Sequence, residues 1–217
     1  NSADLEASLA YKPYLDNLFI GSADCLERNQ GRFSQVSLLQ FAVNPRIFEN
    51  RGLPRESKLY FCGNRTTERQ EALSKVTSIP TVVRGRGWKN YKMGSGEFDI
   101  KANYVNLHGL VAAYNHYLFF FNMIQSPNDT SGLNMRSYEV PACGGLLVCE
   151  YDKELEYTLK PGKELLTFVE PNEINDLLER CLKDESYAKT IAENGQGRVL
   201  AEHTYENRMK QVLSLLA

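Results

Sequence analysis

Short runs of apolar residues alternate with longer segments of mixed polarity along most of the chain. The clearest runs lie at residues 59–62, 81–83, 145–149 and 165–169. Segments with helical spacing lie between or after them, at residues 66–75, 131–142, 173–183 and 186–203. Because fully apolar strands bury both faces, this alternation predicts a Rossmann-like α/β fold, a parallel sheet with helices on both faces.

Three other stretches are less regular. Residues 111–120 have helical spacing and residues 119–124 are typical of a strand, so the boundary between these two elements stays open. Residues 104 and 105 are compatible with a further short strand. Residues 205–216 predict a last helix, and we expect it to pack back towards the first part of the chain.

That first part has a different character. Apolar stretches at residues 17–20 and 36–41 flank a helical segment at residues 22–28. A polar stretch that contains proline follows, up to residue 58. We interpret residues 1–57 as the tail of a preceding N-terminal domain together with a crossover linker. Residues 58–217 then form the second domain.

Composition and charge exclude several classes of protein. The 217 residues carry 25 Lys and Arg against 27 Asp and Glu, whereas proteins that bind nucleic acid usually carry a basic excess. The apolar stretch near residues 117–124 is interrupted by Asn122 and is too short to span a bilayer. Five scattered cysteines without a Cys-x-x-Cys pair indicate reduced thiols, and we expect a cytoplasmic protein. Three histidines without a zinc-binding spacing argue against a metal site.

The first candidate site follows the apolar run at residues 59–62. Gly63 ends that run and Thr66 or Thr67 begins a helix, which places free backbone N–H groups where an anion can bind. Arg65 and Arg69 add guanidinium groups that suit phosphate oxygens. An ordinary strand–helix turn with solvated arginines explains the same pattern equally well.

The second candidate is the Arg-Gly-Arg-Gly-Trp stretch at residues 84–88. Glycines after a strand, such as Gly85, permit a close approach of the backbone to a ligand. Asn90 stands where a dinucleotide-binding fingerprint has its third glycine, which argues against a nicotinamide cofactor. Trp88 is the only tryptophan, and closing the core is an alternative role for it.

The third candidate, residues 132–144, carries polar side chains in a stretch that otherwise runs into the core. Asn134, Arg136 and Glu139 lie close to an apolar segment, and a carboxylate there needs a cation or a hydroxyl pair such as a ribose diol as its partner. We expect Gly132 to open a helix whose free N–H groups face the edge of the sheet. The alternative is a surface ion pair between Arg136 and Glu139.

Taken in order, these stretches resemble the C-terminal half of a GT-B glycosyltransferase, and more narrowly the CgeB-like (spore maturation protein B) group of the group 1 transferases. The strongest parts are an Asn-x-Arg-x-x-Glu pattern at residues 134–139 and a His-Thr-Tyr-x-x-Arg pattern at residues 203–208. The resemblance covers residues 17–216 and implies a Rossmann-like domain that binds a nucleotide-sugar donor.

The resemblance also implies roles for the candidate residues. The loop at residues 63–69 matches the one that holds the donor diphosphate, Glu139 matches the carboxylate that binds the ribose hydroxyls, and residues 132–134 match a loop whose backbone touches sugar and phosphates. Related retaining enzymes carry a glutamate where this chain has Ser131. We expect Arg69 and Glu139 on the same side of the sheet, at the carboxyl ends of its strands. The residues implied to bind the nucleotide sugar are Gly63, Arg65, Arg69, Gly85, Trp88, Gly132, Leu133, Asn134, Arg136 and Glu139.

The implied chemistry is the transfer of a sugar from a UDP- or GDP-linked donor to an unknown acceptor, without a metal ion or other cofactor. Arginines and a helix N-terminus can stabilise the charge on a departing diphosphate, and the chain has no Asp-x-Asp pattern. The acceptor site and any catalytic base would lie on the rest of the N-terminal domain, a partner of this chain. A non-catalytic nucleotide-binding or interaction module of the same fold is the main alternative.

Overall fold

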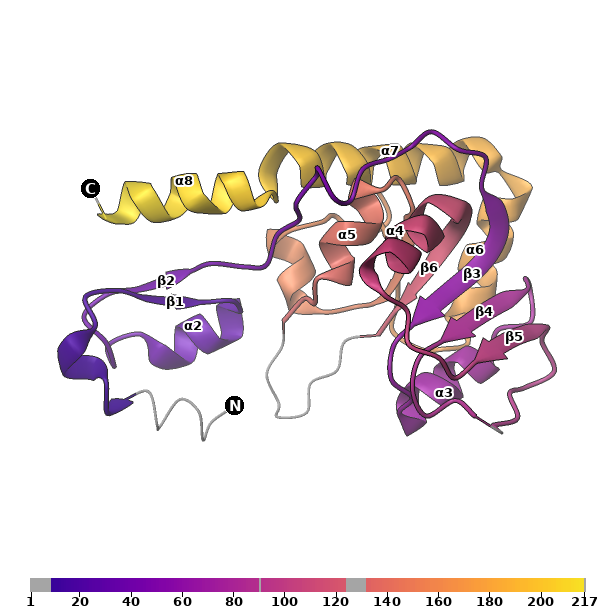
Figure 1. Ribbon diagram of the computed structural model, residues 1–217, viewed down its shortest axis with the longest axis horizontal. Coiled ribbons are helices and arrows are strands. Elements are labelled where there is room, and N and C mark those ends of the chain that lie inside the picture. The colour runs from indigo at the N-terminus through magenta and orange to yellow at the C-terminus, as the bar shows by residue number, and fades with distance from the viewer. Residues whose placement is uncertain (1–8, 90, 124–131, 217) are drawn as a thin grey trace.

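The computed structural model describes residues 9–89, 91–123 and 132–216. Figure 1 shows a small N-terminal lobe, residues 9–41, beside a larger domain built on a sheet of six strands. All neighbouring strands of this sheet run parallel, and helices cover both of its faces. The sheet confirms the predicted Rossmann-like α/β fold.

The order of strands in the large sheet is β5-β4-β3-β6-β7-β8. The strands are β3 (Glu56–Cys62), β4 (Thr81–Arg84), β5 (Phe98–Lys101), β6 (Tyr117–Asn122), β7 (Leu146–Glu150) and β8 (Leu166–Phe168). The chain first builds outwards from β3 to β5, then returns to place β6 on the other side of β3. The order therefore reverses between β3 and β6, and in open α/β sheets ligands bind at the carboxyl ends of the strands at this switch point.

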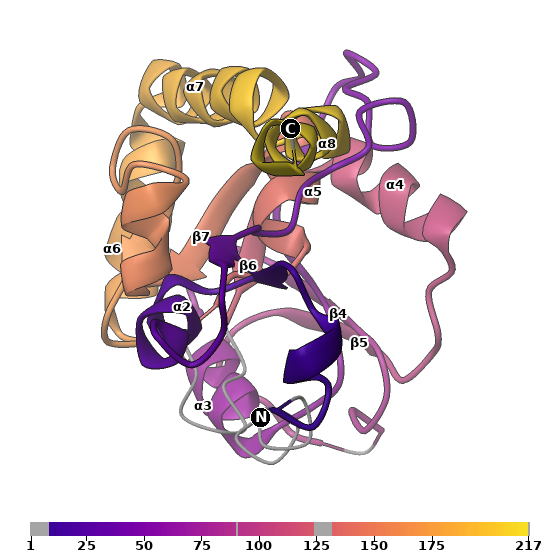
Figure 2. The same ribbon diagram turned by 90° about the vertical axis from the view of Figure 1, so that its left-hand side faces the viewer.

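The helices bury two apolar clusters against opposite faces of the sheet. They are α3 (Thr67–Ser74), α4 (Leu107–His116), α5 (Arg136–Ala142), α6 (Glu173–Lys183) and α7 (Glu185–Glu202). Apolar side chains of α3 and α6 join one cluster, those of α4 and α5 join the other, and α7 contributes to both. Figure 2 shows α6 and α4 on opposite sides of the strands.

Local side-chain chemistry explains why some helix ends were predictable and others were not. The Thr66 hydroxyl accepts a hydrogen bond from the Arg69 N–H and begins α3, as the sequence predicts. The expectation that Gly132 opens a helix is wrong, since α5 begins at Arg136. The side chain of Asn134 is hydrogen-bonded to Asn122 at the end of β6, which holds the preceding residues against the sheet instead.

Two further differences concern strands. The expected strand at residues 104–105 is a loop, and the fifth strand in the chain, β5, lies at Phe98–Lys101. Because β5 is a short edge strand whose residues alternate between exposed and half-buried, it lacks the apolar run that marks the central strands. The boundary left open between helix and strand falls between His116 and Tyr117.

The N-terminal lobe contains its own parallel pair of strands. It consists of η1 (Lys12–Tyr14), β1 (Leu18–Ile20), α2 (Ala23–Asn29) and β2 (Val36–Leu38). The carboxylate of Glu154, in η2 (Lys153–Tyr157) of the larger domain, accepts hydrogen bonds from the Ser22 hydroxyl at 3.1 Å and the Ala23 N–H at 2.5 Å. Glu154 is only 2% exposed, so this carboxylate caps α2 from across the boundary between lobe and domain.

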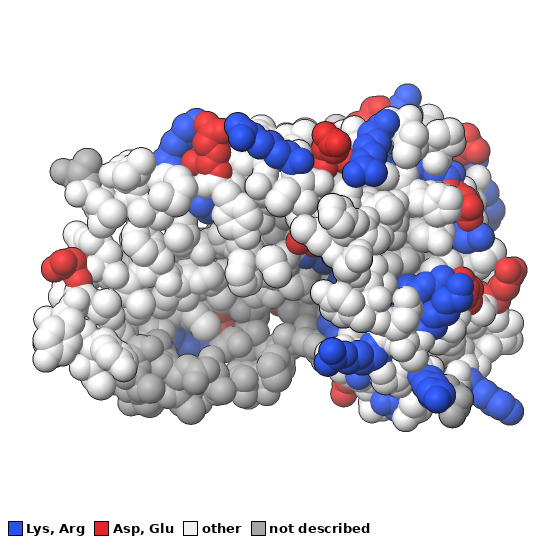
Figure 3. Space-filling view, in the orientation of Figure 1, with Lys and Arg blue, Asp and Glu red and all other residues white. Residues whose placement is uncertain are grey.

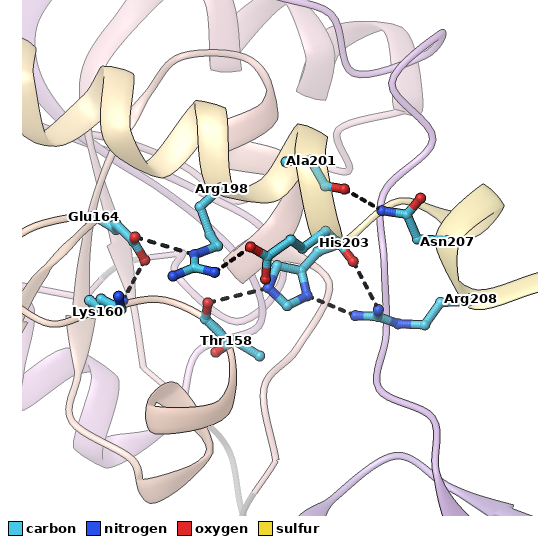
Figure 4. A network of polar contacts seen from close by, with 9 residues as sticks. Thr158, Lys160, Glu164, Arg198, Ala201, His203, Asn207 and Arg208 are labelled. Atoms are coloured by element: carbon cyan, nitrogen blue, oxygen red, sulfur yellow. Dashed lines mark hydrogen bonds and ion pairs between the residues drawn. The ribbon is translucent and has the colours of Figure 1, made fainter. Parts of the chain in front are cut away.

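A second link joins the lobe to the last helix, α8 (Tyr205–Leu216), as Figure 4 shows in part. Arg208 donates to the carbonyl oxygens of Gln40 at 2.9 Å and Phe41 at 3.1 Å, and its Nη2 lies 2.9 Å from His203 Nδ1. The other ring nitrogen of His203 lies 3.2 Å from the Thr158 carbonyl oxygen. Burial, then the charge of Arg208, lower the pKa of His203. These contacts confirm that the last helix packs against the first part of the chain.

Within the described ranges, no helix combines the length and the apolar character that a membrane span requires. The five cysteines are free, and Cys143, Cys149 and Cys181 are buried.

The hydrogen bonds of Arg208 predict a stability effect. Replacing Arg208 with Leu removes hydrogen bonds from a charged donor to the carbonyls of Gln40 and Phe41, and we expect the free energy of unfolding to fall by about 1.5–3 kcal/mol in urea titrations. Lys210→Ala is the matched control, because this residue of the same helix forms only an exposed ion pair with Glu206. That variant should change stability by less than about 1 kcal/mol. Equal losses of unfolding free energy in the two variants would contradict a stabilising role for the Arg208 hydrogen bonds.

Candidate functional site

The candidate site lies at the switch point, where β3 ends at Cys62 and β6 ends at Asn122. Two arginines from helices on opposite faces of the sheet reach this edge. Arg69 comes from α3 and Arg136 is the first residue of α5. Their guanidinium carbons lie 5.4 Å and 5.2 Å from the centre of the same ring, Phe61. The two cations therefore meet above the carboxyl ends of the central strands.

Arg69 is the more deeply placed of the two, with 6% of its surface exposed. It donates to the carbonyl oxygens of Asn64 and Met123, both at 3.1 Å, and so ties the end of β3 to the end of β6. Burial, and then the neighbouring charge of Arg136, lower the pKa of Arg69 to about 10. Its Nε has no hydrogen-bond partner among the described residues. Buried polar groups are normally paired, so this unpaired donor is an exception.

Arg136 is held on both sides. Its Nη1 donates to Asn122 Oδ1 at 2.8 Å and its Nη2 donates to the carbonyl oxygen of Cys62. Arg65 lies on the loop before α3, where its Nε donates to Gln70 at 2.9 Å. Its guanidinium carbon lies 3.6 Å from the centre of the Tyr91 ring. Both arginines are half-buried, so both retain an accessible part.

None of these three arginines forms an ion pair within the described ranges, where ten other pairs do occur. Buried or half-buried cations without a counter-ion carry an unfavourable desolvation free energy. The remaining N–H groups of the guanidinium forks match the oxygens of a phosphate or carboxylate. The edge therefore carries guanidinium groups whose charge has no carboxylate partner among the described residues.

Glu139 lies one turn along α5 and is also half-buried. Its Oε2 accepts a hydrogen bond from the Tyr114 hydroxyl at 3.4 Å, and burial raises the pKa of the Glu139 carboxyl while Arg136 acts in the opposite direction. An exposed ion pair with Arg136, the alternative left open by the sequence, is not formed. We expected Arg69 and Glu139 on the same side of the sheet, and this is wrong. Arg69 belongs to α3 and Glu139 to α5, and these two helices cover opposite faces of the sheet. Arg136, rather than Glu139, joins Arg69 at the edge.

Gly63, Gly85 and Trp88 form a tight crossing of two loops. A Cβ atom at Gly85, whose φ is +126°, would lie 2.2 Å from the Gly63 carbonyl oxygen. The Trp88 indole donates to the same oxygen at 2.9 Å and is 1% exposed. Gly85 and Trp88 therefore shape the loop that carries Arg65, and their side-chain positions offer no surface to a ligand.

The loop at residues 132–134 lies between the lobe and the larger domain. A Cβ atom at Gly132 would meet Ser22 of the lobe at 3.7 Å, and Leu133 is buried. Asn134 Nδ2 donates to Asn122 Oδ1 at 2.9 Å, whereas Asn134 Oδ1 is buried without a partner among the described residues. Ser131 lies outside the described residues. The space-filling view is hollowed between the lobe and the domain (Figure 3).

Sequence reasoning missed the central residue of this edge. Asn122 is fully buried and contacts both Asn134 and Arg136, but in the sequence it is visible only as a polar interruption of an apolar run. A polar residue at the end of a buried strand was the available signal. Within the described ranges, no group of three or more His, Cys, Asp or Glu side chains is arranged to hold a metal ion.

Comparison with known proteins was made at the level of sequence and of structure. The profile of a family described as glycosyl transferase-like matches residues 65–214. No curated protein matches the sequence. Among solved structures, sucrose-phosphate synthase from Thermosynechococcus elongatus shares 17% identity with a TM-score of 0.74, and the match covers 100% of this chain and 61% of that chain.

Two other solved structures are informative. Alr3699/HepE from Anabaena, determined in complex with UDP and glucose, shares 11% identity with a TM-score of 0.74, over 100% of this chain and 67% of that chain. The C-terminal domain of the group 1 family glycosyl transferase LpcC from Francisella tularensis shares 12% identity with a TM-score of 0.56, over 75% of this chain and 99% of that chain. At these identities the structures establish a shared GT-B, Rossmann-like fold. The chain spans 61% of the length of the sucrose-phosphate synthase chain.

The loop crossing predicts the outcome of a glycine substitution. Gly85→Ala places a methyl group against the Gly63 carbonyl, so the two loops must separate. Gly162→Ala is the matched control, because Gly162 also has a positive φ, +72°, but nothing lies within 4 Å of its Cβ position. The control should lose about 1–2 kcal/mol of unfolding free energy in urea titrations from its left-handed backbone alone. The Gly85 variant should lose clearly more, and a loss no larger than the control's would refute the crossing.

Proposed function

The chain belongs to the glycosyl transferase-like family, and we propose that it is the donor-binding domain of a glycosyltransferase. The enzyme would transfer a sugar from a nucleotide-diphosphate donor to an acceptor. The observation that carries this proposal is the pair of guanidinium groups of Arg69 and Arg136 at the switch point, which lack a carboxylate partner among the described residues.

A donor diphosphate fits the charge and geometry of this edge. It would bring phosphate oxygens to Arg65 and Arg136, the two accessible cations, and to the unpaired Nε of Arg69. Hydrogen bonds between guanidinium and phosphate are charge-assisted, and the planar guanidinium fork suits two oxygens at once. Gly63 precedes Arg65 on the loop, and Gly85 and Trp88 fix that loop through contacts with the Gly63 carbonyl.

The same groups can assist the chemistry. When the bond between the sugar and the diphosphate breaks, negative charge develops on the departing diphosphate. Fixed guanidinium groups in a partly water-excluded site stabilise that charge without having to reorganise. We propose on this basis a transfer that does not depend on a metal ion.

Glu139 is proposed to bind the ribose of the nucleotide. Its carboxylate has one described partner, the Tyr114 hydroxyl at 3.4 Å, which leaves acceptor positions for a pair of ribose hydroxyls. The loop of Gly132, Leu133 and Asn134 is proposed to lie along the sugar and phosphates. The buried Asn134 Oδ1, which has no partner among the described residues, supports this placement.

The proposal also assigns parts of the chain to two domains of the enzyme. Residues 58–217 would form the donor-binding domain, and residues 1–57 would belong to the preceding domain and its crossover, with the acceptor site on the rest of that domain. The likeness to the C-terminal domain of LpcC supports this division. The donor base stays open between uracil and guanine, although HepE was determined with UDP. The narrower kinship with CgeB-like proteins also stays a proposal.

One observation favours a second candidate, a non-catalytic module of the same fold. Arg69 is nearly buried and donates to two backbone carbonyls, which is what a purely structural clamp between β3 and β6 would do. Such a module would keep nucleotide binding without catalysis, or would keep only the scaffold. Binding measurements on variants of the site separate a nucleotide site from a purely structural role of Arg69.

The first such variant is Arg69→Ala. We expect it to weaken the binding of UDP or GDP by roughly tenfold to a hundredfold in calorimetry, because a hydrogen bond to a charged group contributes about 1.5–3 kcal/mol. The difference from the unmodified protein should shrink as salt is added. Arg198→Ala is the control, since this arginine of α7 already forms ion pairs with Glu164 and Glu202 and lies on neither helix that carries Arg69 or Arg136. Unchanged affinity in a folded Arg69 variant would favour the clamp.

The second variant concerns Glu139 and pH. Since burial raises the pKa of Glu139, its ionised form, which accepts the ribose hydrogen bonds, is lost as the pH falls through that raised value, above the ordinary value of about 4.3. Binding of the nucleoside itself should therefore weaken on acidification. Glu139→Gln should bind more weakly at neutral pH and lose this dependence. Parallel pH profiles of the two proteins, recorded by calorimetry with uridine and guanosine, would remove Glu139 from the site.

A further inference from the structure

Asn122 is the hub of the candidate site. It is the last residue of β6, and its side chain is fully buried. Its Oδ1 accepts hydrogen bonds from Arg136 Nη1 at 2.8 Å and from Asn134 Nδ2 at 2.9 Å. Its Nδ2 donates to the Ser137 hydroxyl at 3.1 Å and lies 3.6 Å from Cys149 Sγ.

These contacts use both ends of a neutral amide. A side-chain amide offers two acceptor positions on its oxygen and two donors on its nitrogen, and here each end meets two partners. Leucine at this position would leave Arg136, Asn134 and Ser137 without these partners. Aspartate would keep the two acceptor contacts but would place a negative charge directly against the Arg136 guanidinium.

We infer that Asn122 is a positioning residue for the donor diphosphate. It holds Arg136 and Asn134 at the carboxyl edge while leaving the charge of Arg136 free for the phosphates. This inference rests on the proposed function, because it assigns Asn122 to the same donor site. It deepens that function by specifying which part of the donor Asn122 serves, the diphosphate and not the base.

Two substitutions of Asn122 distinguish the ordering of the Arg136 side chain from the availability of its charge. Asn122→Asp should keep the Arg136 side chain ordered, since an ion pair replaces the hydrogen bond, yet should lower the affinity for UDP or GDP at least tenfold. Asn122→Leu should release Arg136 and lower the same affinity. Neither should change the affinity for the corresponding nucleoside more than about twofold, because the change is confined to the phosphate-binding side of the site.

Asn115→Asp is the matched structural control. Asn115 is also a buried asparagine with a full set of contacts: it accepts from the Arg51 N–H and donates to the Glu49 and Val111 carbonyls. It lies on α4, away from the arginines of the switch point. We expect this variant to lose stability, seen as a lower melting temperature, without a selective loss of diphosphate binding.

The experiment combines calorimetry of nucleoside and nucleoside diphosphate with NMR of arginine Nε–Hε groups in the ligand-free proteins. The Arg136 signal is assigned by its loss in Arg136→Lys. In Asn122→Asp this signal should sharpen or shift little. In Asn122→Leu its chemical shift should move to that of a mobile arginine. An ordered Arg136 signal in the Leu variant would overturn the inference. So would an equal loss of nucleoside and diphosphate binding, or a selective diphosphate loss in the Asn115 control.

A different result would overturn the proposed function without overturning the role of Asn122 in ordering Arg136. If the unmodified protein binds neither UDP nor GDP, the donor site is wrong. Loss of Arg136 order in the Leu variant would then show that Asn122 orders the edge, and the assignment of that edge to a diphosphate would be overturned.

Discussion

A guanidinium group that leaves water needs acceptors for its N–H groups and a compensating charge, and the two requirements are met differently here. Arg69 and Arg136 find acceptors in the ends of the strands: the carbonyls of Met123 and Cys62 and the side chain of Asn122. Their charge is left without a carboxylate partner among the described residues. The hydrogen bonds fix the position of the cations, and a buried cation without a counter-ion carries an unfavourable desolvation free energy that a bound anion would offset.

This arrangement depends on where the strand order reverses. Since β3 and β6 are neighbours in the sheet but are followed by helices on opposite faces, side chains from both faces can meet only over their carboxyl ends. The tight contact between Gly85 and the Gly63 carbonyl fixes the adjoining loop, which carries Arg65. The topology of the sheet therefore brings Arg69 and Arg136 together, and no single sequence motif could do so alone.

Several strands and one helix start were predictable from the sequence, and the physical reasons can be named. The buried central strands are recognisable because both of their faces are apolar, and α3 because Thr66 caps it. The start of α5 was not predictable, because it depends on a contact between Asn134 and a strand distant in sequence. The types of the site residues follow from local chemistry. Which of these residues are accessible and which, such as Trp88, are buried and hold a loop in place is decided by the packing between loops.

The lobe adds a second constraint that local patterns do not reveal. Its helix α2 is capped by Glu154 of the larger domain, and its carbonyls at Gln40 and Phe41 are bound by Arg208 of α8. Both contacts join segments more than a hundred positions apart in the chain. They hold Ser22 against the loop that begins at Gly132, at the border of the candidate site. The geometry of the loop at residues 132–134 is thus linked to the position of the lobe.

The most direct test of this account is a crystal structure of the chain with a bound nucleoside diphosphate. The account predicts the diphosphate over the carboxyl ends of β3 and β6, with phosphate oxygens within hydrogen-bond distance of Arg136 and of Arg69 Nε. A nucleotide bound at the amino ends of the strands would contradict it. So would a diphosphate at the switch point that contacts neither arginine.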